Sequence, residues 1–165
     1  MEFRFWKLFY LHIQCLKVSD NSCVFCREVV GKHRASVIYE TDSVIAFMDI
    51  APVEPGHALV IPKKHFVNIL DIDYEDYLEV HRVTKYLSPY IVRAVNADGI
   101  NIGQNNGKSA NQRVFHYHVH IIPRFQEREL KWGRMQAENW QLEEVAEKVR
   151  SEIQKNGTSD GISLR

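Results

Sequence analysis

The 165-residue sequence has no excess of charge of either sign, because 21 lysine and arginine residues balance 21 aspartate and glutamate residues. A protein without net charge exerts no general attraction on a polynucleotide or an anionic membrane surface. The sequence also lacks any apolar run near the roughly 18 residues expected of a membrane-spanning helix. We therefore expect neither nucleic-acid nor membrane binding, while a local pocket for a single nucleotide stays compatible with this composition.

Cysteine is scarce as well. Cys15, Cys23 and Cys26 are three residues and cannot form a closed set of disulfides, and a chain of this length does not need such cross-links. This pattern favours a reducing compartment, so we expect a cytoplasmic protein. The chain has no internal repeat, and its length suits one domain with a hydrophobic core.

The hydrophobic pattern predicts an α+β domain around an antiparallel sheet of about five strands with a long helix packed on it. Runs of valine, isoleucine and aromatic residues predict the strands, of which the first two form a hairpin. These strands are expected at 36–40, 43–49, 57–61, 100–104 and 114–123.

Two helices are predicted from a helical period of apolar residues. The first covers 73–96 and contains Pro89, so we expect a kink or two shorter helices there. Its shared apolar face is predicted to hold Leu78, Val83, Leu87, Ile91 and Ala94. The second helix covers about 139–154.

We divide the chain into three parts. These are an extension at 1–20, a main domain at 21–130, and a C-terminal segment at 131–165 that ends in a loose tail after Gly157. The extension is rich in aromatic residues, but charged residues interrupt it and no convincing cleavage site follows. We interpret it as an ordinary extension, with targeting or partner binding as the alternative.

Eight histidines are unusual for this length, and three of them lie within five positions. In a strand, successive side chains point to opposite faces, so His116, His118 and His120 share one face. Apolar residues alternate with them: Tyr117, Val119 and Ile121. Same-face neighbours lie about 6.6 Å apart in a strand, so one metal ion could join two of the histidines but hardly three. The histidines must therefore have different roles.

Imidazole is a competent nucleophile and general acid or base near neutral pH. Its attack on phosphorus gives a phosphoramidate that water later opens, and donors near the phosphate stabilise the developing charge. The polar loop at 105–113 supplies amide, hydroxyl and guanidinium donors immediately before the histidines. This combination predicts a phosphate site, whereas the loop by itself would indicate only a solvated hairpin.

The Cys23-x-x-Cys26 spacing fits either a zinc site or a redox dithiol. The redox alternative expects a strand-to-helix setting in a βαβ fold, which the pattern does not indicate. A structural zinc needs four ligands, and His65 and His116 are the natural candidates for the other two. Two unlinked buried thiols are the alternative.

The motifs together resemble the histidine-triad family, whose signature alternates histidines with apolar residues. The signature is His116-Tyr117-His118-Val119-His120-Ile121-Ile122, followed by Pro123-Arg124. Other landmarks match in order along residues 23–124: Cys23-Val24-Phe25-Cys26, Ala46-Phe47-Met48-Asp49-Ile50, the run from Pro55 to His65, and Asn105-Asn106-Gly107. The chain is most similar to zinc-containing microbial-type members of the Hint-like branch.

This resemblance implies a hydrolase or transferase acting on the α-phosphate of an AMP derivative. Such derivatives are nucleoside phosphoramidates, adenylated amines and dinucleoside polyphosphates. It implies that His118 is the nucleophile, with His120 and His57 beside the phosphate and leaving group. It also implies a homodimer with one continuous sheet. The implied nucleotide-binding residues are Asp49 at the ribose, Val24, Phe25, Phe47 and Ile50 at the purine base, and Asn105, Gln112 and Arg113 near the phosphate. The implied zinc ligands are Cys23, Cys26, His65 and His116.

Two positions depart from the family pattern. Arg113 replaces a small hydroxyl residue that assists the leaving group in many Hint-like members, which favours a more anionic leaving group here. Glu28 and the His33-Arg34 pair replace residues that are usual near the base pocket, which puts base selectivity in doubt. Two other functions stay open: a zinc-dependent hydrolase with His116 and His118 as catalytic ligands, and a non-catalytic AMP-binding sensor or adaptor.

Overall fold

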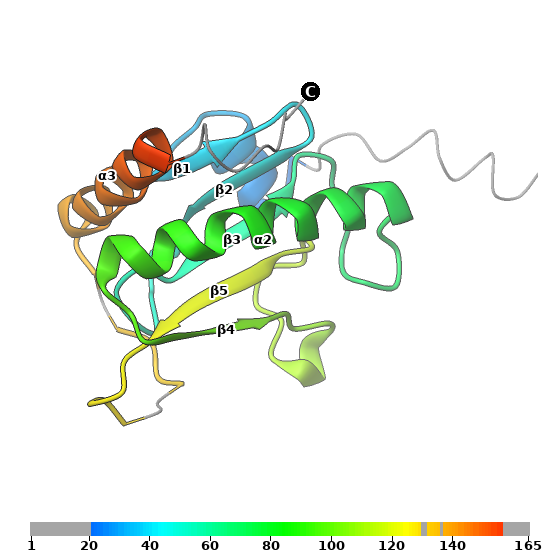
Figure 1. Ribbon diagram of the computed structural model, residues 1–165. Helices are drawn as coiled ribbons and strands as arrows, with labels where there is room; N and C mark the ends of the chain where they lie inside the picture. The colour runs from blue at the N-terminus through cyan, green and yellow to red at the C-terminus, as the bar shows by residue number, and fades with distance from the viewer. Residues whose placement is uncertain (1–20, 130–131, 136, 157–165) are drawn as a thin grey trace, which may run out of the picture.

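The computed structural model describes residues 21–129, 132–135 and 137–156. The chain forms one five-stranded sheet in the order β1-β2-β3-β5-β4, with antiparallel pairing throughout (Figure 1). This confirms the predicted antiparallel sheet and the predicted hairpin of the first two strands. The strands are β1 Val37–Glu40, β2 Val44–Met48, β3 Ala58–Pro62, β4 Gly99–Gly103 and β5 Val119–Arg124.

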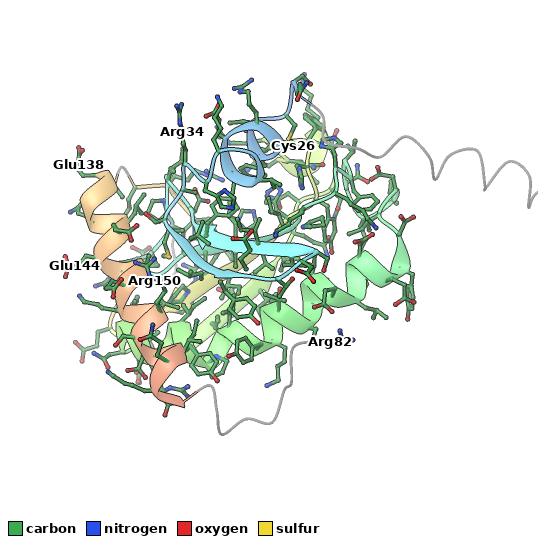
Figure 2. All side chains as sticks on the ribbon, turned by 90° about the horizontal axis from the view of Figure 1, so that it is seen from above. Cys26, Arg34, Arg82, Glu138, Glu144 and Arg150 are labelled. Carbon is green, nitrogen blue, oxygen red and sulfur yellow. The ribbon has the colours of Figure 1, made fainter. Side chains whose placement is uncertain are left out.

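Both faces of the central strands are covered. Every residue of β2 and β3 is buried, because alternate side chains point into two separate apolar clusters. On one face, Ala46 and Val60 pack with helix α2 (Tyr74–Val95). On the other, Phe47 and Leu59 pack with the short helix η1 (Phe25–Val30). Figure 2 shows Cys26 on the η1 side of the sheet, opposite α2.

Helix α2 differs from the prediction at two points. It runs through Pro89 as one helix of 22 residues, so the expected division into two helices was wrong. A side-chain hydrogen bond supports the helical turn just before Pro89, where Ser88 Oγ donates to the carbonyl of Thr84 at 2.7 Å. Leu78 was expected on the buried face but is exposed, because Asp76 and Val80, two residues to either side, are the buried residues of these turns and Leu78 points away from them.

The last strand begins five residues later than predicted. β5 starts at Val119, so His116 and His118 precede the strand in a segment that bends at 114–116 and has no sheet pairing. Its partner β3 ends at Pro62, which has no N–H to continue the ladder. This segment instead hydrogen-bonds to the chain beyond β3, where Tyr117 N donates to Phe66 O at 2.6 Å. The alternation of faces survives, since Tyr117 and Val119 belong to the α2 core while His116 and His118 lie beside Phe25 on the other face.

The predicted C-terminal helix is present as α3 (Asn139–Asn156), which packs beside α2 and β1. Leu142, Ala146 and Val149 are its buried residues and belong to the same core as α2. The short π-helix η1 had not been predicted. The predicted extension at 1–20 and the predicted loose tail after Gly157 lie outside the described residues. Within the described residues, no helix has the length and apolarity needed to cross a membrane.

Candidate active site

The segment at 116–118 and β5 place the three histidines on the side of the sheet that faces η1. Tyr117 and Val119 point into the α2 core, whereas the rings of His118 and His120 lie 4.9 Å apart on the opposite face. All three histidines are buried. The alternation that the sequence predicted is therefore present, although only His120 belongs to a regular strand.

Backbone contacts fix the tautomer of His118. Its Nδ1 donates to the carbonyl oxygen of His116 at 2.6 Å, which is a short and well-defined hydrogen bond. A neutral imidazole has one N–H and one lone pair, so the lone pair of His118 lies on Nε2. The ring lines a cavity between η1, β2 and the loop at 105–114. This arrangement presents a nucleophilic nitrogen to any group bound there.

Val53, His57 and His120 form a chain of hydrogen bonds in which each donor is fixed. The backbone N–H of Val53 donates to His57 Nδ1 at 3.0 Å, so the proton of a neutral His57 lies on Nε2. That nitrogen is 2.9 Å from Nδ1 of His120 and donates to it. The proton of a neutral His120 then lies on Nε2. His120 is therefore a hydrogen-bond donor beside the ring of His118.

Burial keeps these imidazoles neutral near pH 7. It is the largest influence on the pKa of His118, His57 and His120, and it lowers each from the ordinary value of 6.5. The positive charge of Arg134 lowers all three pKa values further. Neutral His118 is the form with an available lone pair, so its Nε2 can act as a nucleophile at neutral pH.

Asp49 is a buried carboxyl at the edge of this group. Its Oδ1 accepts a hydrogen bond from Ala51 N at 2.9 Å, while no described residue donates a hydrogen bond to its buried Oδ2. Burial raises the pKa of Asp49, which is the cost of keeping an ionised oxygen without a donor. An oxygen of this kind is suited to a ligand that brings its own hydroxyl groups.

A cavity of about 360 Å³ surrounds these groups. Phe25 stands edge-on to Phe47 with ring centroids 5.4 Å apart, and it also lies edge-on to His118 at 5.7 Å. The cavity brings together most residues that the sequence predicted for nucleotide binding: Val24, Phe25, Phe47, Asp49, Ile50, Asn105 and Arg113. It has an apolar aromatic end and a polar end beside the histidines.

Gln112 is the exception among these predicted residues, because it does not line this cavity. Its side chain is buried and holds the loop together. Its Oε1 accepts from Gly107 N at 2.7 Å, and its Nε2 donates to Val114 O at 3.1 Å. Since the amide already bonds to the loop, the geometry favours an orienting role over direct phosphate contact.

Cys23 and Cys26 lie close to two histidines, His65 and His116. Ligand atoms of Cys23, Cys26, His65 and His116 all lie within 4.8 Å of one another. Nδ1 of His116 is 3.5 Å from both sulfurs, and Nδ1 of His65 is 3.4 Å from the sulfur of Cys26. A tetrahedral zinc with Zn–S of about 2.3 Å and Zn–N of about 2.1 Å places sulfur and nitrogen about 3.6 Å apart. The four residues therefore fit a zinc ion.

His116 is oriented for that role. Its Nε2 donates to Pro62 O at 2.8 Å, which leaves the lone pair of Nδ1 toward the sulfurs. His118 does not belong to the group, since its Nδ1 is bound to a carbonyl. The alternative of a catalytic zinc held by His116 and His118 does not fit this geometry.

Asp49, His57 and His120 form a second group with ligand atoms within 4.8 Å of one another. The hydrogen bond between His57 and His120 requires a proton on one of the two facing nitrogens. A metal ion would need both lone pairs, so the arrangement fits a hydrogen-bonded pair better than a second metal site.

Comparison with known proteins agrees with these motifs. The family model described as the HIT domain matches residues 30–127. The chain belongs to the HIT family. A HIT relative, the adenosine 5'-monophosphoramidase hnt1 of Schizosaccharomyces pombe, is 39% identical over 103 residues, which cover 62% of this chain and 74% of the relative.

Two further HIT proteins bear on the site. The adenylylsulfatase HINT3 of Arabidopsis thaliana is 35% identical over 114 residues, which cover 69% of this chain and 57% of the relative. The crystal structure of a zinc-bound histidine triad family protein from Mycobacterium smegmatis is 34% identical, with a TM-score of 0.76. The match covers 84% of this chain and 98% of that chain.

The HIT domain of this chain has a second cavity, of about 320 Å³, that the sequence did not reveal. It lies along β4 and shares Asn105, Asn111, His120 and Arg134 with the first cavity. Trp132 and Arg134 come from the segment after β5, which has no motif. No short-range pattern could have placed them, because their positions depend on how this segment folds back over the sheet.

Proposed function

We propose that this HIT protein is a hydrolase or transferase acting on the α-phosphate of an AMP derivative. The observation that carries the proposal is the hydrogen bond from His118 Nδ1 to the carbonyl of His116, which leaves the Nε2 lone pair in the nucleotide-sized cavity. The relatives described as an adenosine 5'-monophosphoramidase and an adenylylsulfatase support the substrate class.

The reaction proceeds in two displacements. His118 Nε2 attacks the α-phosphorus and forms a P–N bond, while the bond from phosphorus to the leaving atom breaks and its electron pair departs with that atom. The Nε2–H of His120 is placed to hydrogen-bond the phosphate or the leaving atom. Water then attacks the same phosphorus and loses one proton, the P–N bond breaks with its electron pair returning to His118 Nε2, and AMP is released. The proton lost by water balances the one that an amine leaving group takes up.

The polar and apolar ends of the cavity suggest how AMP is oriented. The purine base lies between the apolar walls that include Phe25 and Phe47. The ribose hydroxyls donate to Asp49 Oδ2, which otherwise has no donor among the described residues. Asn105 and Arg113 face the phosphate from the loop, and Gln112 keeps that loop in place.

We assign Cys23, Cys26, His65 and His116 to a structural zinc. When bound, the ion supplies folding free energy by joining segments from three parts of the chain. The carbonyl of His116 accepts the hydrogen bond from His118, so the zinc ligand and the nucleophile share one stretch of backbone. Ordering of the metal site therefore also orders the nucleophile.

The covalent intermediate gives a direct test. An adenosine 5'-phosphoramidate reaction quenched during turnover should yield protein whose mass has increased by one adenylyl group. Peptide mapping should place that group on His118. Modification of another residue, or an unmodified protein under conditions of rapid turnover, would contradict the mechanism; tight AMP binding without turnover would favour a sensor.

We also propose that two copies pair through β4 and the start of α2. β4 lies at the edge of the sheet, and its Ile102 is 50% exposed. Nearby apolar side chains on the loop before α2 and on its first turns are exposed as well: Leu70, Tyr74 and Leu78. The measured mass in solution should be twice 19.3 kDa. An Ile102→Lys variant should shift that mass toward the monomer, and a wild-type monomer would rule the pairing out.

A further inference from the structure

The two cavities of the active site meet at the place where a substrate would be divided. Displacement at phosphorus requires the attacking and leaving atoms to lie roughly in line. The second cavity shares Asn105, Asn111 and His120 with the cavity that His118 lines, so it is the adjoining space that a leaving group can enter.

The lining of the second cavity is positive and rich in amides. Among its described lining residues, Arg134 is the one permanent charge, and no carboxylate lines the cavity. Asn101, Gln104 and Asn105 add side-chain amides. Its volume of about 320 Å³ lies within the range of about 300–1,000 Å³ typical of small-molecule sites. The cavity has space for a group far larger than an ammonia molecule, and its charge favours an anion.

Three contacts fasten the segment that carries Arg134. The N–H of Met135 donates to Pro52 O at 2.7 Å, and Arg128 pairs with the largely buried Glu54 at 2.8 Å. The guanidinium of Arg124 lies over the ring of Trp132, 4.6 Å from its centroid. Arg134 thus has a defined place at the junction of the cavities.

Arg134 also keeps donors available for a ligand. Its Nη1 lies 3.6 Å from Asp49 Oδ1, which is an ion pair but too long for a hydrogen bond. A guanidinium has five N–H donors in a planar fork that matches phosphate oxygens. A substrate oxyanion can therefore bind Arg134 without displacing a strong existing contact.

We propose that Arg134 is a specificity-determining residue that selects substrates with an oxyanion leaving group, nucleoside phosphates in particular, bound in the second cavity. This rests on the proposed function. For such a substrate, the bond from the α-phosphorus to the bridging oxygen breaks, and the oxygen keeps the electron pair. The departing phosphate gains negative charge that Arg134 offsets. An amine leaving group requires a proton instead and gains nothing from this guanidinium.

The test compares two substrates in wild-type protein and Arg134→Gln. The ratio of kcat/KM for diadenosine triphosphate to kcat/KM for adenosine 5'-phosphoramidate should fall about 10- to 100-fold, as expected for loss of a charge-assisted hydrogen bond. Arg134→Lys should restore part of the ratio. Adenosine 5'-phosphosulfate has a small oxyanion as its leaving group, which leaves most of the second cavity unfilled. Arg134→Gln should therefore lower kcat/KM less for this substrate than for diadenosine triphosphate. An equal fall for the two substrates would overturn the preference for nucleoside phosphates.

Arg82→Gln is the matched control, because it removes an exposed arginine on α2 that lines neither cavity and does not contact the Arg134 segment. It should leave the ratio unchanged. An unchanged ratio in Arg134→Gln, or an equal fall in both variants, would overturn the proposal. If wild-type protein hydrolyses neither substrate, the proposed function fails. Ligand affinities of the His118→Asn protein then test the Arg134 proposal separately. Adding Arg134→Gln to this protein should lower its affinity for diadenosine triphosphate more than its affinity for AMP.

Discussion

Replacing His118 by asparagine is expected to lower kcat for an adenosine 5'-phosphoramidate by about four orders of magnitude or more, the scale of loss when a catalytic nucleophile is removed. An asparagine amide has no basic lone pair on nitrogen and cannot attack phosphorus. It can still donate to the carbonyl of His116, which the imidazole Nδ1 does at 2.6 Å. The backbone of the segment should therefore be preserved.

Released AMP measures turnover, and calorimetry measures AMP affinity, which should change by less than about threefold because binding of the nucleoside does not depend on this nitrogen. His33→Asn is the matched control. His33 is exposed and adopts φ of 50°, a left-handed conformation that asparagine also tolerates. Hydrolysis near the wild-type rate in His118→Asn, with His33→Asn equally active, would exclude His118 as the nucleophile.

Removing the metal is expected to destabilise the fold before it affects the chemistry. Cys26→Ala removes one of the four candidate zinc ligands, whose sulfur lies 3.4 Å from His65 Nδ1 and 3.5 Å from His116 Nδ1. Loss of a structural zinc site costs several kcal/mol, and for a domain of this size about 3–5 kcal/mol corresponds to a fall in Tm of about 10 °C. Chelation of the wild-type protein should produce a similar fall.

Elemental analysis and thermal unfolding together measure this effect. Cys15→Ala serves as the control, because it removes a thiol but leaves the four-residue group intact. Activity should decline in step with unfolding, since His116 supplies both a ligand and the carbonyl that orients His118. Wild-type protein that is purified without metal, and a Tm unaffected by Cys26→Ala, would exclude a structural zinc. Immediate loss and return of activity in a fully folded protein would instead indicate a catalytic metal.

The prediction of the fold succeeded where local pattern and long-range packing agree. The runs at 43–49 and 57–61 are apolar at nearly every position, and both are central strands buried on two faces. The prediction failed where contacts with another segment determine the bounds of a strand or helix. The strand expected to begin at Val114 begins at Val119 because β3 ends at Pro62, and helix α2 continues through Pro89 because it stays packed against the sheet along its length.

The sequence by itself determined that His118 and His120 share one face, because side chains alternate along an extended chain. It also determined the family. The tertiary structure alone decided the direction of the hydrogen bond from His57 to His120, since these two residues lie 63 positions apart. It alone placed Arg134 beside Asp49, 85 residues away in the chain. Such contacts leave no local signal, because each follows from how the strands and the segment after β5 pack together.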